Sequence, residues 1–436
     1  MNVYIKIEIK ERELLSRMLV GSYLALKGHD IFLGEDDLFN YLEKKILNPG
    51  VILEKSISNV KHRINQLNFY KKNNFKLTTL DEEGGLNTSD FTDFVKRRFS
   101  NKTLNNSDLV FCWGKYDYTK ITNIYNKFKN KFIISGNPRF DFNKVLNNKK
   151  NFKKKIIIIP SFFTLTRKSR IVDNLIVRRN LYKNKIKEKD WFNYVSTKSK
   201  ETFNLLDLIY NIKKRFKKLN LEIWVHPKED VNLWKKIIPE HKYLKYCKEK
   251  NFNNTSENHS LFLFTGSTLG LDVVINRRHL IYYNSINNHQ KNVPIKFAKE
   301  IKDPKKVLNY IENFFKEKNK KKINKNINKN IENYVHNAKK DIYASKIISD
   351  KINQLQSKEI SRKNTFLNNN LNHLYFKNFL RLIRQKLKYE IYNDKFAPFT
   401  APEIQKTKRM LVNFDKKFKN ISIQLIGPKL IRIRKL

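Results

Sequence analysis

The first 34 residues, MNVYIKIEIKERELLSRMLVGSYLALKGHDIFLG, decide the fold class. In residues 2–9 apolar side chains occupy every second position, which is the period of a half-buried β-strand. In residues 14–26 they recur every three or four positions, as on one face of a helix, and Gly28 follows as a helix stop. A second short strand is expected at residues 31–33, and Gly34 begins a turn. This strand–helix–strand order is typical of a parallel, doubly wound sheet.

The same alternation continues to about residue 140. Strands are expected at residues 50–53, 76–80, 109–113 and 132–135, with helices at 59–73, 90–99 and from 115 to about 129. Together these elements predict a Rossmann-like domain over residues 1–150.

A second Rossmann-like domain is predicted over residues 151–315. It opens with Lys155–Pro160, a fully apolar strand of the kind buried at the centre of a parallel sheet. Further strands are expected at 221–225, 261–264 and 279–283, with helices at 201–217 and 269–276 and a basic inserted loop at 166–190. Residues 316–436 are expected to be a basic, mainly helical extension.

The charge is extreme, with 90 Lys and Arg against 41 Asp and Glu and a formal net charge of +49. One interpretation is an anionic partner such as a nucleotide, a lipid headgroup or a nucleic acid. The alternative is compositional, because Lys, Asn, Ile, Phe and Tyr are abundant together and share A/T-rich codons. The Lys residues are spread along the chain, which favours the compositional interpretation for most of the charge.

Cys112 and Cys247 make neither a disulfide framework nor a zinc cluster, which fits a reducing cytoplasm. Acidic residues near the N-terminus argue against a signal peptide. The longest apolar run, Ile156–Leu165, is too short to span a bilayer. We therefore expect a cytoplasmic protein, with any membrane contact peripheral at the anionic inner membrane through residues 166–187 and 404–436.

Polar segments that follow strands are the candidate sites, since ligands of open α/β sheets bind at the carboxyl ends of the strands. In the second domain, one strand end and the helix after it carry Thr265, Gly266, Ser267, Thr268, Gly270 and Asp272. Backbone N–H groups at a helix start attract anions, and small side chains let a phosphate approach. The alternative is an ordinary helix cap without a ligand.

His226, Pro227 and Glu229 follow another strand of that domain. His226 is a candidate for a phosphate contact or for acid–base chemistry. The alternative is a structural turn histidine.

In the first domain, Asp81, Glu82 and Glu83 follow a strand and precede two glycines. Three adjacent carboxylates repel one another, so their presence at a strand end favours use of one as a general base. The alternative is a solvated acidic turn.

Gly136–Asp141 ends the first domain. Its Arg139 is suited to bind a phosphate or a sugar carboxylate through two hydrogen bonds, with Asn137 beside it. A boundary turn closed by an Arg–Asp pair is the alternative. Glu11 and Arg12 open the first helix and, with Gly34, are placed at the same edge, although an acid at a helix start is favourable without any function.

Several familiar signatures are missing. The sequence has no GxGxxG, Walker A, HExxH or GxSxG motif and no paired Cys/His spacing. It therefore supports neither a metal site nor a bound cofactor.

The order of these motifs resembles the bacterial family called surface carbohydrate biosynthesis protein. The residues that carry the resemblance are Glu8, Glu11–Leu14, Gly28, Gly34, Gly50, Lys55-Ser56, Leu80–Gly84 and Gly136–Asp141. In the second half, His226-Pro227, Glu229, Gly266–Thr268 and Gly270 resemble the donor half of capsule polysaccharide transferases, including Kdo transferases, and of CDP-glycerol glycerophosphotransferases. The resemblance covers roughly residues 1–300.

The resemblance implies a GT-B-like architecture, in which two Rossmann-like domains face each other across a cleft. It implies transfer of a sugar from a nucleotide-activated donor to a glycan or lipid-linked acceptor during synthesis of a surface polysaccharide such as capsule or lipopolysaccharide. The donor phosphates would lie at Thr265–Gly270 beside His226, with Arg139 opposite, and a carboxylate of Asp81–Glu83 would act as base. Helix dipoles can stabilise a leaving phosphate, so this chemistry requires no metal.

Four other functions stay open from the sequence. A polyol-phosphate transferase and a sugar-nucleotide epimerase share the expected architecture. A nucleic-acid-binding protein is suggested by the charge, but no RNA- or DNA-binding module is recognisable and no specific nucleic acid is expected. A non-catalytic scaffold is the fourth.

Overall fold

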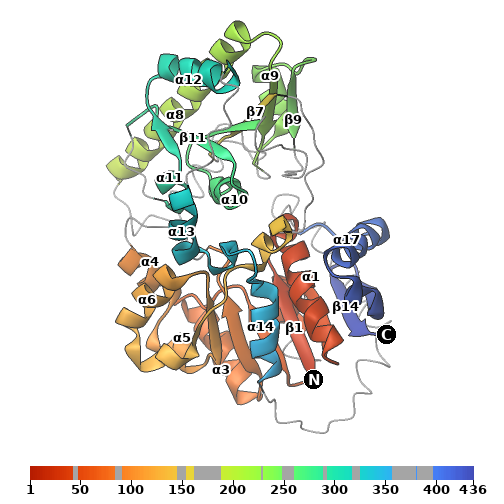
Figure 1. The fold of residues 1–436 in the computed structure, drawn as a ribbon. Helices are drawn as coiled ribbons and strands as arrows, with labels where there is room; N and C mark the ends of the chain where they lie inside the picture. The colour runs from red at the N-terminus through yellow and green to blue at the C-terminus, as the bar shows by residue number, and fades with distance from the viewer. Residues whose placement is uncertain are drawn as a thin grey trace. The chain divides into compact units, whose positions relative to one another are not determined.

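The computed structural model describes residues 1–42, 48–83, 91–144, 154–161, 188–226, 229–247, 260–287, 292–316, 325–355, 380 and 396–436. These residues form two compact units, each with its own sheet (Figure 1). The first unit combines Met1–Val145 with Lys329–Leu436, and the second is Leu146–Asn328. The α/β fold class expected from the sequence is confirmed, with parallel strands at the centre of both sheets.

The first unit contains an eight-stranded sheet in the order β13-β14-β2-β1-β3-β4-β5-β6. Its N-terminal elements, with η for 3-10 helices, are β1 Asn2–Ile7, α1 Lys10–Leu26, β2 Asp30–Glu35, α2 Asp36–Leu42, β3 Val51–Glu54, α3 Lys61–Lys72, β4 Lys76–Leu80, α4 Phe91–Arg98, α5 Asn101–Asn105, β5 Leu109–Cys112, α6 Lys115–Ile124, η1 Asn126–Lys131, β6 Phe132–Ile134, η2 Pro138–Phe140 and η3 Phe142–Lys144. All pairings from β2 to β6 are parallel. Successive side chains of β1 point to opposite faces of the sheet. All six residues are buried, because both faces of a parallel sheet are covered.

The C-terminal part of the chain returns to this unit. Its elements are α13 Lys325–Tyr334, η5 His336–Ala338, α14 Ala344–Asn353, α17 Ala401–Phe414, η6 Lys416–Asn420, β13 Ile421–Gly427 and β14 Leu430–Lys435. α14 packs on α1, where Ser349 Oγ donates to the Val20 carbonyl at 3.1 Å. The expected mainly helical extension is therefore wrong for its last residues, which form two strands and extend the sheet beyond β2.

Gly34 explains how this hairpin attaches. It lies within β2 and pairs with Leu430 of antiparallel β14, so the turn expected to begin there is wrong. A Cβ at position 34 would stand 2.4 Å from the Lys429 carbonyl oxygen. The buried Lys429 ammonium also pairs with Glu35 at 2.5 Å, and Arg432 pairs with Asp30. Part of the basic tail thus neutralises acids of this sheet.

The second unit has a six-stranded parallel sheet in the order β12-β11-β10-β7-β8-β9. Its elements are β7 Lys155–Ile159, α8 Glu188–Arg215, β8 Asn220–Trp224, α9 Val231–Ile237, β9 Leu244–Cys247, β10 Ser260–Phe264, α10 Gly270–Ile275, β11 His279–Tyr283, α11 Val293–Lys296, β12 Lys299–Ile301 and α12 Pro304–Lys316. The apolar β7 lies between β10 and β8 at the centre, as its composition predicts.

α8 differs from the expected helix in its length and its faces. It already begins at Glu188, inside the segment expected to be a loop, whereas residues 166–187 lie outside the described ranges. Leu205, Leu208, Ile209 and Ile212 pack into the core, but Phe203 is 62% exposed. Phe203 therefore lies on the outer face of the helix.

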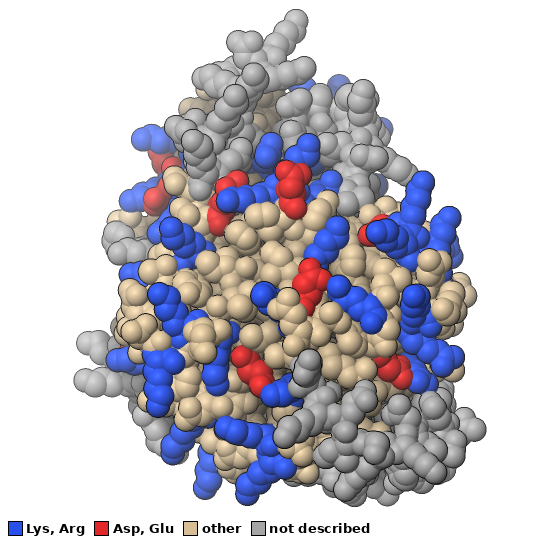
Figure 2. Space-filling model, turned by 60° about the horizontal axis from the view of Figure 1, so that its bottom comes forward, with Lys and Arg blue, Asp and Glu red and all other residues tan. Residues whose placement is uncertain are grey.

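Figure 2 shows Lys and Arg scattered across one face of the molecule, with Asp and Glu between them. In the part of the chain that the structure describes, no helix has the length and apolar character needed to cross a membrane.

Candidate functional site

The first sheet has a switch point between β1 and β3. β2 lies on one side of β1, whereas β3 to β6 follow in order on the other. The connections that leave two such strands diverge, and polar residues at their carboxyl ends form the usual ligand site of the fold. Here Glu8 follows β1 and Lys55 follows β3, and their side chains form an ion pair across the switch point.

Glu13 in the first turn of α1 is a buried acid at this edge. Its Oε2 accepts a hydrogen bond from the Glu8 N–H at 2.9 Å, and its Oε1 lies 2.6 Å from Nη2 of Arg12. Burial raises the pKa of Glu13 to about 7; the Glu82 charge adds to the rise, while Arg12 and Arg17 oppose it. A carboxyl with a pKa near neutrality can take up and release a proton at physiological pH, as a general base must.

The sequence places Glu11, Arg12 and Glu13 together at the start of the first helix, and of these Glu11 and Arg12 were the candidate site residues. In the structure Glu11 is exposed and Arg12 is held by Glu13. The missed signal is the position of Glu13 on the apolar stripe of the helix, directly before Leu14 and one turn before the buried Arg17. An acid and a base placed there are expensive to bury unless they are paired or used.

Glu82 joins three elements of this unit. Its side chain is only 3% exposed, and its oxygens lie 2.9 Å from Arg17 Nη2 and 3.0 Å from Asn137 Nδ2. Arg17 Nη2 also donates to the Leu80 carbonyl at 3.2 Å. These contacts connect α1 with the loops after β4 and β6, so Glu82 stabilises the carboxyl edge of the sheet.

Asp81 and Glu83 share Arg98. Asp81 Oδ2 lies 3.5 Å from Arg98 Nη1, Glu83 pairs with Nη2, and the Glu83 N–H closes a turn by donating to Asp81 Oδ1 at 2.9 Å. Burial raises the pKa of Asp81 despite Arg98. Burial acts in the same direction on Glu83, but Arg98 outweighs it and holds the pKa of Glu83 below its ordinary range. Of the two, Asp81 is therefore the better proton acceptor near neutral pH. Gly84 and Gly85 lie outside the described residues.

The segment Gly136–Asp141 receives the C-terminal part of the unit. Asn137 and Asn337 are paired, with the Asn137 N–H donating to Asn337 Oδ1 at 3.0 Å and Asn337 Nδ2 donating to the Asn137 carbonyl at 2.8 Å. Asp141 caps α14 by accepting from the N–H groups of Ala344 at 3.0 Å and Ser345 at 2.8 Å. The alternative offered by the sequence was an Arg139–Asp141 pair, but the Asp141 carboxylate instead accepts hydrogen bonds from Asn337, Ala344 and Ser345.

Arg139 lies between aromatic rings. Its guanidinium carbon is 4.5 Å from the ring centre of Phe140 and 5.3 Å from that of Trp113. Stacking on aromatic faces fixes the plane of a guanidinium. This arrangement suits the predicted phosphate or carboxylate contact, which stays a prediction.

In the second unit the switch point lies between β7 and β10, and residues after both strands meet there. Ser161 follows β7 and Thr265 follows β10. The Ser161 N–H donates to Thr265 Oγ1 at 2.8 Å, and Thr265 Oγ1 donates to Ser161 Oγ at 3.1 Å. Ser161 was not selected from the sequence, although it directly follows the Pro160 that ends the apolar strand.

The predicted phosphate loop continues from Thr265. Gly266 has φ +104°, which favours glycine, and its carbonyl accepts from Asn292 Nδ2 at 2.9 Å. Ser267 Oγ accepts from the Leu269 N–H at 3.4 Å, Thr268 is exposed, and Asp272 lies in the first turn of α10. At Gly270 a Cβ would stand 2.9 Å from the ring of Phe264, so this glycine lets the helix approach the strand.

His226 and Glu229 follow β8, the neighbour of β7. The buried Glu229 carboxylate accepts from the His226 N–H at 3.0 Å, and the Glu229 N–H donates to the His226 carbonyl at 2.9 Å. This turn presents His226 at the same sheet edge as Ser161 and Thr265. Pro227 lies outside the described residues.

The predicted residues thus fall into two groups, one at the carboxyl edge of each sheet. Gly34 belongs to neither group, because it pairs with β14 and leaves the space that the Lys429 carbonyl oxygen needs. Within the described ranges, no cluster of three or more His, Cys, Asp and Glu side chains has an arrangement that could hold a metal ion.

No protein-family model and no curated protein matches the sequence. Among solved structures, a Staphylococcus aureus MnaA–UDP complex has a TM-score of 0.49 at 11% identity over 80% of this chain and 95% of its own. A putative UDP-N-acetylglucosamine 2-epimerase from Listeria monocytogenes has a TM-score of 0.48 at 11% identity over 82% and 98%. A variant of the wall teichoic acid polymerase TagF has 0.48 at 11% over 81% and 88%.

Proposed function

We propose that this chain is a glycosyltransferase-like enzyme of bacterial surface polysaccharide biosynthesis. It transfers a sugar from a nucleotide-activated donor to a glycan or lipid-linked acceptor. The observation that carries the proposal is chemical complementarity between the two sheet edges: one holds a buried carboxyl, Glu13, whose pKa is about 7, and the other holds small hydroxyl and glycine residues beside a histidine. Both groups lie where open α/β sheets bind ligands.

In this proposal the second unit binds the donor. Thr265, Gly266 and Ser267 leave room for phosphate oxygens close to the backbone, and His226 donates to the same group. The developing charge on the leaving phosphate is then met by preorganised dipoles and by His226, without a metal or a cofactor.

The first unit binds the acceptor. Glu13 or Asp81 takes the proton of the attacking hydroxyl, Glu82 keeps α1 in place, and Arg139 contacts the donor phosphate or an acidic sugar.

Nucleotide binding tests the donor half of the proposal. CMP, CDP, UDP, GDP and dTDP are compared by thermal shift at fixed salt on wild type, on Ser267→Ala and on Ser422→Ala as a remote serine control in β13. A ligand at about 100 times its Kd stabilises the native state by roughly 2.7 kcal/mol. We expect one base to stand out and Ser267→Ala, but not the control, to lose the shift. Equal weak shifts with all five nucleotides would indicate charge alone and argue against a donor site.

Product analysis tests the reaction itself. The preferred nucleotide sugar is incubated with and without a lipid-linked or glycan acceptor. Acceptor-dependent release of the nucleotide supports transfer. An epimerised sugar formed without any acceptor would replace this proposal by a sugar-nucleotide epimerase.

We further propose that the enzyme meets its acceptor at the anionic inner membrane, with α8 as the contact. Phe203 and Tyr210, each 62% exposed, stand two helical turns apart on its outer face, and Lys200 and Lys214 are exposed on the same face. Aromatic side chains flanked by lysines suit the interface of an anionic bilayer. Co-sedimentation with phosphatidylglycerol vesicles should fall several-fold in a Phe203→Ser/Tyr210→Ser variant. Binding that is equal on neutral vesicles, or unchanged in the variant, would contradict this contact.

A further inference from the structure

One edge of the first sheet is formed by β13, in the hairpin at the end of the chain (Figure 1). Among the described residues, the only strand that pairs with β13 is β14. An edge strand carries unpaired backbone N–H and C=O groups, and proteins usually protect such an edge with lysines or proline. β13 has the sequence ISIQLIG, without a charged residue or a proline, although the chain carries 90 Lys and Arg. The edge therefore lacks the usual side chains that prevent pairing.

The register of the hairpin shows which backbone groups of β13 point outward. The Leu436 N–H donates to the Asn420 carbonyl at 2.9 Å, so these two opposite residues form a hydrogen-bonded pair. In an antiparallel ladder such pairs alternate with pairs that do not bond to each other. The pairs that contain Ile421, Ile423 and Leu425 are of the second kind. The N–H and C=O groups of these three residues are therefore directed to the outer edge.

The outward groups fit a second copy of the same strand. A β-bulge between Leu425 and Gly427 ends the regular part of β13, so Ile421–Leu425 form an even edge with Ile423 at its centre. With a second copy placed by a two-fold axis through Ile423, this residue lies opposite itself and Ile421 lies opposite Leu425. All three outward-directed residues are then paired through both their N–H and C=O groups. No other antiparallel register of this segment with itself pairs all three.

The side chains of β13 follow the same symmetry. In this register Ile421, Ile423 and Leu425 of the two copies meet on one face of the sheet, and Ser422 of each copy lies opposite Gln424 of the other on the second face. Ile423 and Leu425 are half-buried in the single chain, so pairing removes further apolar area from water. An unrelated strand would need the same alternation by chance, whereas an identical copy has it by symmetry.

We propose that β13 is a self-association surface, at which two copies of the chain form a dimer with one continuous β-sheet across a two-fold axis. This surface does not depend on the transfer reaction proposed above. The formal charge of +49 makes two copies repel each other, and salt screens that repulsion. The dimer should therefore become tighter as salt is added. A few residues on each side make a small interface, so the association is reversible and depends on concentration.

Sedimentation velocity of the full chain over a concentration series tests the proposal. Wild type should shift reversibly from one chain to two, at lower concentrations as the salt is raised. Ile423→Lys places two ammonium groups opposite each other across the axis and should weaken dimerisation at least about tenfold. Gln424→Lys is the matched control, because it adds the same charge opposite Ser422, and it should change dimerisation less than about threefold. A wild type that stays monomeric at every concentration and salt, or equal effects of the two substitutions, would overturn the proposal.

A disulfide test keeps the proposal falsifiable if Ile423→Lys loosens the hairpin. The Cα atoms of a hydrogen-bonded antiparallel pair are about 5.5 Å apart, within the reach of a disulfide. Under mild oxidation Ile423→Cys should give a covalent dimer, whereas Gln424→Cys should not, because its two Cα atoms would lie beyond the limit of about 7 Å. Both variants carry Cys247→Ser, since Cys247 is half-exposed, whereas Cys112 is buried. No cross-link at position 423, or a stronger one at position 424, would overturn the proposal.

Discussion

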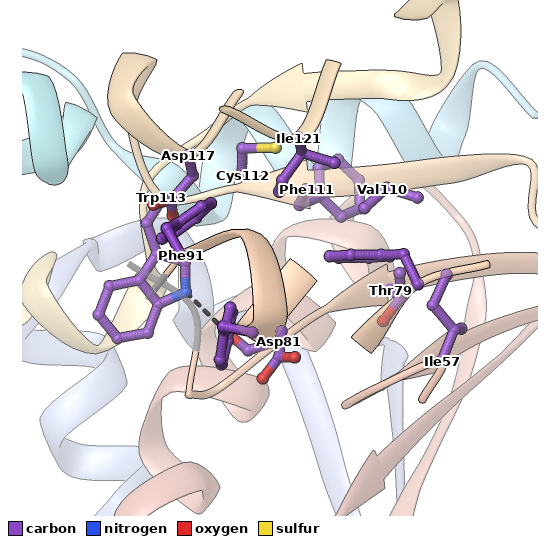
Figure 3. A pocket seen from close by; sticks show the side chains of 12 residues that line it. Ile57, Thr79, Asp81, Phe91, Val110, Phe111, Cys112, Trp113, Asp117 and Ile121 are labelled. Atoms are coloured by element: carbon purple, nitrogen blue, oxygen red, sulfur yellow. Dashed lines mark hydrogen bonds between the residues drawn. The ribbon is translucent and has the colours of Figure 1, made fainter. Parts of the chain in front are cut away.

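Asp117→Asn should stabilise the first unit increasingly as the pH rises. Burial in the lining of a small aromatic pocket raises the pKa of Asp117 from an ordinary 3.8 to about 8, with a smaller contribution from the Asp81 charge (Figure 3). The folded chain therefore keeps a proton that the unfolded chain releases between about pH 4 and pH 8, so the contribution of this carboxyl to stability is present below pH 4 and is lost as the pH approaches 8. Each pH unit in this window costs up to about 1.4 kcal/mol. Asparagine does not titrate, so the free energy of unfolding of the variant, relative to wild type, should grow by up to about 2.7 kcal/mol from pH 5 to pH 7.

Hydrogen exchange of the amides in β5 and α6, followed by mass spectrometry, measures the opening free energy of this region alone. Wild type and variant are compared at the same pH, so intrinsic exchange rates cancel. Asp81 and Cys112 are the other titratable groups in the pocket; burial holds the pKa of Cys112 well above this window, and Asp81 is present in both proteins. A difference that stays constant from pH 5 to pH 8 would show that Asp117 is ionised in the folded state and would refute the reasoning.

Three further predictions concern the acidic edge and the C-terminal attachment. Glu13→Gln should lower the transfer rate at least 100-fold at a temperature where the variant is folded, because general-base catalysis contributes about 10²–10⁴-fold; a rate within threefold of wild type would exclude Glu13 as the base. Gly136→Ala should destabilise the first unit by about 2 kcal/mol or more in urea unfolding, because its φ is +85° and the new Cβ would stand 2.1 Å from Asn337 Oδ1; an unchanged midpoint would contradict this packing. Lys429→Met should cost about 3 kcal/mol by removing the buried partner of Glu35, and Glu35→Gln in the same chain should recover part of the loss in the same assay.

Much of the fold was predictable because it depends on local patterns. β4 at Lys76–Leu80 and β11 at His279–Tyr283 have the expected bounds, since a polar residue, Asp81 or Asn284, directly follows each strand. The C-terminal hairpin was not predictable in the same way. Its attachment depends on β14 pairing with β2, about 400 residues earlier in the chain, and on Gly34 leaving space for Lys429. Local periodicity carries no information about such a partner.

The position of polar residues at strand ends was likewise readable from the sequence, and it placed Asp81, Asn137, His226 and Thr265 at the carboxyl edges of their sheets. The chemical state of these residues was not. Whether a carboxyl group forms an ion pair, and where its pKa lies, depends on which groups from distant segments surround it. Glu82 is held by Arg17 and Asn137, whereas burial brings the pKa of Glu13 near neutrality.

The sequence by itself therefore determined the α/β class, the alternation of strands and helices, and the strand ends at which polar residues gather, because these follow from periodicity and chain order. The tertiary structure decided that the end of the chain completes the first sheet, that Glu13 rather than Glu11 is the buried acid of α1, and that Asp117 is buried in the lining of an aromatic pocket. Burial and electrostatic environment are properties of residues brought together by folding, and no single segment of the sequence contains them.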